Sequence, residues 1–156
     1  MKKAVSLILC VIMMFSVMSV SAFASDETVV SETVTYLDDG SYMVTVLTES
    51  ENLLSRATST KTGSKTTTLY NSDSEAVVQL KLTGTFSYTG SSASCTASSV
   101  SYTVYDSSWK VTSSTASKSG NKAIGDFVSK HYVLLIPVQT IETTITITCS
   151  NSGTLS

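Results

Sequence analysis

Residues 77–88, Val-Val-Gln-Leu-Lys-Leu-Thr-Gly-Thr-Phe-Ser-Tyr, alternate between apolar and polar side chains. In an extended strand every second side chain lies on the same face, so this alternation predicts one buried face and one polar face. The predicted buried side chains are those of Val78, Leu80, Leu82, Phe86 and Tyr88. Gly84 falls on the same face and indicates a bulge or a closely packed neighbour. The stretch therefore predicts a long strand with one side in a hydrophobic core.

The same alternation recurs on both sides of this strand, interrupted by short polar stretches typical of turns. Further strands are predicted at residues 66–70, around Cys95, and at 109–117, 123–136 and 139–150. After Cys95 the apolar positions change from odd to even numbers, which predicts a bulge or bend near residues 97–99. The continuous apolar run at 132–136 predicts a strand covered on both faces, or one whose outer face meets the amino-terminal part of the chain.

A second pattern lies nearer the amino terminus. Residues 32–46 contain two alternating runs around Asp38-Asp39-Gly40, a typical hairpin turn because glycine adopts positive φ readily. Residues 49–62 lose the alternation, which predicts a linker. We therefore expect an amino-terminal β-hairpin and linker over residues 25–62 and a main domain over residues 63–156.

The number and spacing of these segments indicate the fold class. About six or seven short strands without a long helical pattern predict an all-β protein, an antiparallel β-sandwich. Both an immunoglobulin-like and a jelly-roll-like strand order fit the pattern. The chain is rich in Ser and Thr. Threonine is β-branched and favours strands, so these residues fit the solvent-facing side of the sheets.

Residues 1–24 have the pattern of an export signal. Two lysines precede a long apolar run that ends in Ala22-Phe23-Ala24. Small residues at these positions predict cleavage between Ala24 and Ser25, and hence a secreted protein. The alternative is an uncleaved amino-terminal anchor, because the run is nearly long enough to cross a bilayer. Cys10 lies inside the apolar run and does not fit a lipid-attachment signal.

Cleavage would leave two cysteines, Cys95 and Cys149. An even number of thiols in an exported chain predicts a disulfide, and two thiols allow one pairing. Closing the intervening loop would stabilise the fold by about 4 kcal/mol in the chain-entropy model. A redox-active pair would be expected as Cys-x-x-Cys, and a zinc site would need further ligands close by.

Charge and composition argue against several classes of function. After removal of residues 1–24, eight basic residues remain against twelve acidic ones, without a Lys/Arg cluster. That balance argues against nucleic-acid binding. The remaining chain has no second apolar stretch long enough to cross a bilayer, so no membrane span is expected in the mature form.

The sequence offers no clear catalytic or cofactor site. His131 is the single histidine, and the chain has no Gly-x-Ser-x-Gly motif. A histidine-based metal site is not expected, because one imidazole and scattered carboxylates make no ligand cluster. Calcium binding is left open by the sequence. The acidic residues that could supply oxygen ligands are Asp38, Asp39, Asp106 and Asp126. We expect no catalytic residue, metal or cofactor.

Several segments resemble small exported proteins of Firmicutes. They are residues 36–42, residues 82–90, and the stretches Ser94-Cys95-Thr96, Trp109-Lys110-Val111, Ser117-Lys118-Ser119-Gly120-Asn121 and residues 148–156. The resemblance implies a secreted protein of Gram-positive origin. It implies no activity, because none is established for that group.

Aromatic residues are the best candidates for a binding surface. Tyr105 and Trp109 adjoin a turn and are predicted to be available for stacking on a ligand, whereas Tyr102 shares the parity of apolar neighbours and is predicted to lie in the core. The leading hypothesis is a non-enzymatic binding module for a glycan or a surface protein. One alternative is a small secreted hydrolase or toxin that uses carboxylates such as Asp38 and Asp39. Another is a structural protein that assembles by strand addition.

Overall fold

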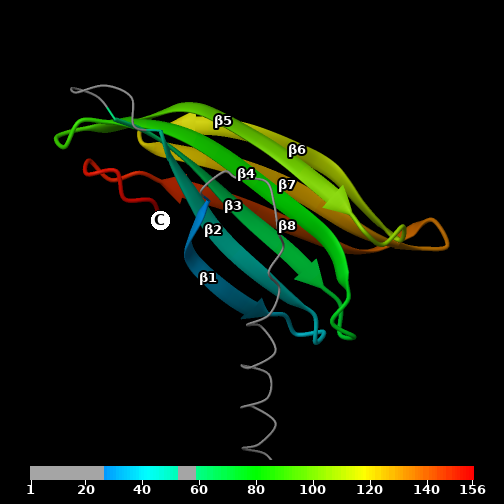
Figure 1. Cartoon of the computed structure of the whole chain (residues 1–156). Coiled ribbons are helices and arrows are strands. Elements are labelled where there is room, and N and C mark those ends of the chain that lie inside the picture. Colours follow the sequence, from blue (N-terminus) through cyan, green and yellow to red (C-terminus); the bar gives the residue numbers. More distant parts are fainter. Residues whose placement is uncertain (1–26, 53–58) are drawn as a thin grey trace, which may run out of the picture.

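The computed structural model describes residues 27–52 and 59–156 (Figure 1). The predicted signal peptide, its cleavage site at Ala24 and Ser25, and residues 53–58 of the predicted linker lie outside the described residues. Within the described ranges, no helix is long and apolar enough to cross a membrane.

The described chain is all-β and consists of strands that form two antiparallel sheets. The strands are β1 (Thr28–Tyr36), β2 (Tyr42–Asn52), β3 (Ser59–Tyr70), β4 (Ala76–Tyr88), β5 (Ala93–Val104), β6 (Trp109–Ser119), β7 (Lys122–Val133) and β8 (Ile136–Thr148). One sheet has five strands in the order β1-β2-β3-β4-β5, and the other has three in the order β6-β7-β8. Strands that are neighbours in sequence are also neighbours within each sheet, and the two sheets pack face to face as in a β-sandwich.

The long strand predicted at residues 77–88 is confirmed as β4, and its apolar side chains point into the space between the sheets. Val78, Leu82 and Phe86 are all at most 1% exposed. Gly84 faces β7 at a close approach, because a Cβ atom at this position would lie 2.7 Å from the Cβ of Ala123. The glycine is therefore required by the packing of one sheet on the other. Phe127, Ile145 and Ile147 complete the core from the opposite sheet.

The predicted parity change in β5 has the expected cause. The register of β4 on β5 passes from Thr85 opposite Ala97 to Phe86 opposite Cys95, which leaves Thr96 without a partner in the ladder. The bulge lies at Thr96, one residue before the predicted range. It turns the Cys95 side chain inward although the following apolar residues occupy even positions.

β1 and β2 pair through a turn in which Gly40 has φ of 83°. β2 then pairs with β3 along its whole length, so these strands continue the same sheet as β4 and β5. The expected boundary between residues 62 and 63 falls inside β3. Alternation is hidden there because the inward side carries an ion pair: the Lys61 ammonium lies 3.2 Å from the Glu49 carboxylate, and Lys61 is buried.

Two expectations about apolar residues are wrong. The run at 132–136 is not one covered strand, because the chain turns at Leu134 and Leu135 and leaves both almost fully exposed. A continuous apolar run does not distinguish a buried strand from an exposed hairpin tip. Tyr102 is 48% exposed rather than buried. It lies on β5, an edge strand of its sheet, which has a neighbouring strand on one flank only.

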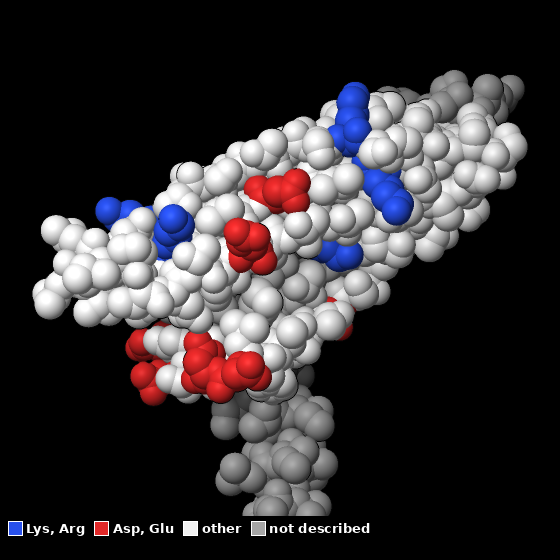
Figure 2. All heavy atoms as spheres, turned by 180° about the vertical axis from the view of Figure 1, so that it is seen from behind, with Lys and Arg blue, Asp and Glu red and all other residues white. Residues whose placement is uncertain are grey.

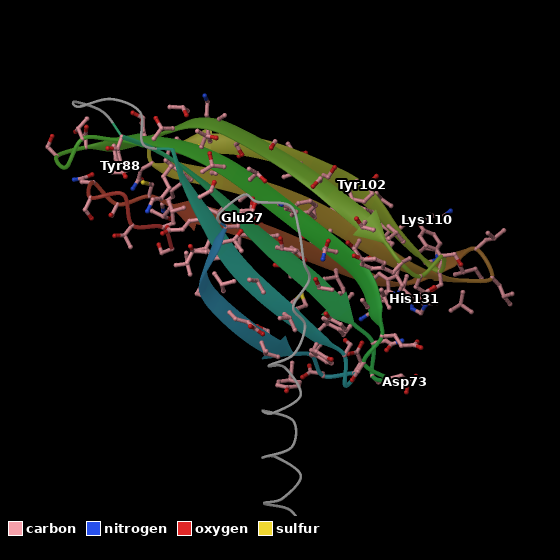
Figure 3. The ribbon with its side chains drawn as sticks, in the orientation of Figure 1. Glu27, Asp73, Tyr88, Tyr102, Lys110 and His131 are labelled. Atoms are coloured by element: carbon pink, nitrogen blue, oxygen red, sulfur yellow. The ribbon has the colours of Figure 1, made fainter. Side chains whose placement is uncertain are left out.

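Because successive strands are antiparallel, the connections gather at two opposite ends. The end that we call the aromatic end carries the turns at residues 37–41, 71–75, 105–108 and 134–135. The other, the cysteine end, carries the turns at 89–92 and 120–121 and the carboxyl-terminal residues 149–156. Figure 3 shows His131, Lys110 and Asp73 toward the aromatic end and Tyr88 toward the cysteine end.

Candidate functional site

A pocket of about 240 Å³ opens between the two sheets at the aromatic end. Its walls come from turns that are far apart in the sequence and from the ends of strands in both sheets. The polar and aromatic side chains that line it include Asp39, Asn71, Asp106, Trp109, His131 and Gln139. The pocket therefore combines carboxylates, amides and aromatic rings in one concave place.

Trp109 and His131 form one wall of the pocket. They occupy opposite positions on β6 and β7, and their rings stack with centroids 5.1 Å apart and planes 7° from parallel. Trp109 is only 8% exposed, whereas His131 is half-buried. Trp109 was expected on the surface, but its ring is packed in the core and only part of it reaches the pocket. His131 was not predicted as its stacking partner, because a pairing between two strands leaves no local signal in the sequence.

Asp39 links the two sheets at the mouth of the pocket. One carboxylate oxygen accepts hydrogen bonds from the backbone N–H of Ser41, at 3.0 Å, and from the Ser41 hydroxyl. The other accepts a hydrogen bond from the Gln139 amide nitrogen on β8 at 3.0 Å. The hydroxyl of Ser41 in particular, together with its N–H and the Gln139 amide, lowers the pKa of Asp39. The carboxylate is therefore ionised and held in place at neutral pH.

Asp106 has a similar arrangement in the β5–β6 turn. Its carboxylate accepts hydrogen bonds from the backbone N–H and from the hydroxyl of Ser108, both at 2.8 Å. These bonds, the backbone one foremost, lower the pKa of Asp106, and the nearby His131 contributes in the same direction. The pocket thus contains two fixed carboxylates, and both favour the charged form.

Tyrosines extend the site onto the outer face of the five-stranded sheet. Tyr36, Tyr42 and Tyr70 are neighbours on β1, β2 and β3. The rings of Tyr42 and Tyr70 stack 4.9 Å apart, and that of Tyr36 lies tilted 5.8 Å from Tyr42. Burial raises the pKa of Tyr70, which lines the pocket, and Tyr42 and Tyr105 add to the shift.

Tyr105, predicted as a stacking residue, is 55% exposed and lies near Tyr70 rather than in the pocket wall. The structure therefore brings Tyr105 and Trp109 to the same end but not into one stacking surface. Gln139 was not predicted at this site, and Tyr70 ranked behind Tyr105 and Trp109 among the aromatic rings that could face a ligand. The alternating pattern around Tyr70 and Gln139 predicts strands but does not indicate which strand ends meet.

The four aspartates considered for calcium are not gathered together. Asp39 and Asp106 line the pocket, whereas the carboxylate of Asp126 on β7 accepts a hydrogen bond from the Thr144 hydroxyl at 2.7 Å. Asp38 is an exposed turn residue. Among the described residues, no group of three or more His, Cys, Asp or Glu side chains could hold a metal ion.

Cys95 and Cys149 lie at the opposite end of the molecule. Both are buried free thiols, so the predicted disulfide between them is not formed in this structure. Their backbone N–H groups donate to consecutive carbonyls of the β6–β7 turn, Cys95 to Gly120 and Cys149 to Asn121. Each thiol is also directed at a nearby backbone carbonyl, that of Ala97 or Ser150. Burial raises the pKa of both thiols.

Comparisons of the chain with protein-family models, with curated proteins and with solved structures find no match. The residues of the pocket themselves indicate what it can bind. Two ionised carboxylates can accept hydrogen bonds from ligand hydroxyls or amines, and the Gln139 side chain can both donate and accept. The half-buried imidazole and the tyrosine rings offer flat surfaces to a ring-shaped ligand.

Proposed function

We propose that this protein is a secreted, non-enzymatic binding module that holds a glycan in the pocket at the aromatic end. The observation that carries the proposal is the presence of two turn-held carboxylates, Asp39 and Asp106, in the same pocket as the stacked rings of Trp109 and His131. Secretion from a Gram-positive cell rests on residues 1–24 and on the resemblance described above.

The chemistry of the pocket suits a sugar. Sugar hydroxyl groups donate strong hydrogen bonds to carboxylates. Asp39 and Asp106 already accept hydrogen bonds from Ser41 and Ser108, so their carboxylates are held in place before a ligand binds and lose little conformational freedom on binding. The volume of about 240 Å³ lies below the roughly 300 Å³ at which pockets for drug-sized ligands begin, and so fits a single sugar ring. Exposed neighbours such as Tyr36 and Tyr105 extend the contact surface for further units of a chain.

The electrostatics favour binding over hydrolysis. A glycoside hydrolase needs one carboxylic acid whose pKa is raised, so that it can protonate the leaving oxygen. The pKa values of both Asp39 and Asp106 are shifted in the opposite direction by their hydrogen bonds. The alternative of a secreted hydrolase or toxin that acts through carboxylates therefore has less support.

The test is a glycan array followed by calorimetric titration with the best oligosaccharide. We expect Gln139→Ala and His131→Ala each to weaken binding about tenfold, since each removes a hydrogen bond or a flat contact surface from the pocket. Gln79→Ala is the matched control. The half-buried amide of Gln79 on β4 donates a hydrogen bond to the Thr68 hydroxyl on β3, and Gln79 does not line the pocket. Equal binding by all three variants, or no enrichment of any glycan, would contradict the proposal.

The disulfide belongs to the same proposal. We expect Cys95 and Cys149 to be oxidised to a disulfide after export, with a thiol oxidant of the extracellular environment accepting the two electrons and the two protons released. The two cysteines lie at the same end of the sandwich, where their backbone N–H groups donate to the consecutive carbonyls of Gly120 and Asn121. Mass spectrometry of the secreted chain should find residues 25–156 lighter by two hydrogens than the dithiol form; alkylation of both thiols without prior reduction would overturn this part.

A second candidate, assembly by strand addition, is favoured by one observation. β1 is an edge strand whose nine residues are all exposed, and Val29, Val34 and Tyr36 give it an apolar character. Such an edge is a template for pairing with another strand. In sedimentation experiments this candidate predicts concentration-dependent assembly that Val29→Lys with Val34→Lys abolishes. A monomer at all concentrations would eliminate it.

A further inference from the structure

The tip of the β7–β8 hairpin is the most apolar exposed surface among the described residues. The exposed fractions are 49% for Val133, 91% for Leu134, 89% for Leu135, 65% for Ile136 and 56% for Val138. Figure 1 shows this hairpin extending beyond the neighbouring turns at the aromatic end. Isolated exposed apolar residues are common in proteins, but a contiguous exposed cluster marks an interaction surface.

The conformation of the tip adds a second argument. Leu134 and Leu135 both have positive φ, 49° and 68°. A two-residue hairpin turn with positive φ at both positions is typically formed by Asn-Gly, because bulky side chains are unfavourable there. Two leucines therefore weaken the turn and also expose apolar surface. Residues that are unfavourable for local structure concentrate where a protein binds something.

The shape of the tip indicates the kind of partner. Val133 at the end of β7 and Ile136 at the start of β8 are opposite each other in the ladder, so their exposed side chains lie on the same face of the hairpin. Leu134 and Leu135 form the turn beyond them and are almost fully exposed. The tip therefore projects as an apolar apex with an apolar flank, and such an apex can enter the hydrocarbon of a bilayer without a complementary groove on a partner.

Basic and aromatic residues lie directly behind the apolar tip. Lys110 and Lys130 occupy opposite positions on β6 and β7, and the Lys110 ammonium lies 5.2 Å from the ring centroid of Tyr132. Figure 2 shows lysine side chains next to the projecting end, with acidic groups below this end and further along the same face. Lysine attracts anionic lipid headgroups, and tyrosine is enriched at the membrane–water interface.

We infer that the β7–β8 tip inserts into the interfacial region of a lipid bilayer that contains anionic lipids, with Leu134 and Leu135 in the acyl region and Lys110 and Lys130 among the headgroups. This membrane contact uses a surface beside the glycan pocket and does not depend on glycan binding. It attaches the protein to the membrane surface without crossing the bilayer.

The experiment is sedimentation of the protein with vesicles of phosphatidylcholine, either pure or with about one-third phosphatidylglycerol. The central variant is Leu134→Asn with Leu135→Gly, which replaces the apolar tip by the preferred turn sequence and so preserves folding. We expect it to partition at least about tenfold more weakly, since each inserted leucine contributes about that factor. Lys110→Gln with Lys130→Gln should weaken binding to the anionic vesicles alone.

Val29→Asn is the matched control, because it removes an aliphatic side chain that is 60% exposed on the edge strand β1. It should bind vesicles like the wild type. Failure of the wild type to bind vesicles, or equal binding by the Leu134→Asn, Leu135→Gly variant, would overturn the inference. So would a concentration-dependent dimer of the wild type that this variant abolishes, because the tip would then be covered by a second copy of the chain.

Discussion

The two ends of the sandwich are built from the same strands but differ in how they are closed. At the cysteine end the carboxyl-terminal segment folds back on the chain. Cys149 and Leu155 pair through their backbones in an isolated antiparallel β-bridge, and Leu155 is 2% exposed. Gly153 packs so closely on Tyr88 that a side chain there would strike its ring. At the aromatic end the corresponding leucines, Leu134 and Leu135, lie in solvent. Leu155 at the cysteine end is buried, whereas the two leucines at the hairpin tip of the aromatic end are exposed.

The two ends differ in how much apolar surface they bury and in which polar side chains they hold in place. Burial of a leucine stabilises a protein by about 1.5–3 kcal/mol relative to exposure, so the aromatic end leaves stabilisation unused. It also fixes Asp39 and Asp106 in a pocket and leaves Tyr36 and Tyr105 exposed. The proposed glycan pocket and the proposed membrane contact therefore both lie at the end whose hairpin tip leaves leucines exposed.

The largest expected effect compares a leucine from each end. Leu155→Ala should lower the free energy of unfolding by about 3 kcal/mol, because the buried Leu155 side chain packs against Gly63 and its removal leaves a cavity there. Leu135→Ala should change it by less than about 0.5 kcal/mol, since the side chain is 89% exposed. Urea unfolding measures both; similar losses would remove the distinction between the ends.

A smaller effect of opposite sign is expected at the aromatic end. Replacing Leu134 by Asn and Leu135 by Gly should raise the free energy of unfolding by about 1 kcal/mol, because both new residues tolerate positive φ. Thermal unfolding in the absence of lipid measures the change. A lower midpoint would mean that the two leucines stabilise the fold through contacts of their own.

The smallest effect concerns the pH dependence of the pocket. The folded-state pKa of Asp106 is lowered, so its contribution to stability is present above the ordinary pKa of about 3.9 and is lost as pH falls through the lower folded value. Ser108→Ala removes the hydroxyl but keeps the backbone N–H bond, so it should move the pKa of Asp106 part of the way back toward the ordinary value and reduce the acid dependence below about pH 4. Carboxyl NMR titration measures the pKa; an unchanged value would show that the Ser108 hydroxyl does not contribute to the shift.

The sequence predicts most of the fold because alternation reports burial directly. β4 and the inward isoleucines of β8 follow from period two alone, and the bulge in β5 follows from a change of parity. Prediction fails where the alternation of apolar residues does not coincide with burial. Buried Lys61 hides the alternation in β3, and an apolar run at Leu134 forms a turn instead of a covered strand.

The pocket is harder to predict for a different reason. Asp39 and Gln139 are far apart in the chain, and their hydrogen bond exists because a turn of one sheet meets a strand of the other. The stack of Trp109 on His131 likewise depends on the register of β6 on β7. Residue types indicated aromatic and acidic candidates, but only the packing of the sheets decides which of them share a site.

The most direct test of the division between the two ends is amide hydrogen exchange with and without vesicles containing phosphatidylglycerol, read by mass spectrometry. We expect added protection in peptides that cover residues 130–138, together with unchanged exchange in those that cover residues 89–92, 120–121 and 149–156. Protection confined to the cysteine end, or the same at both ends, would contradict the account.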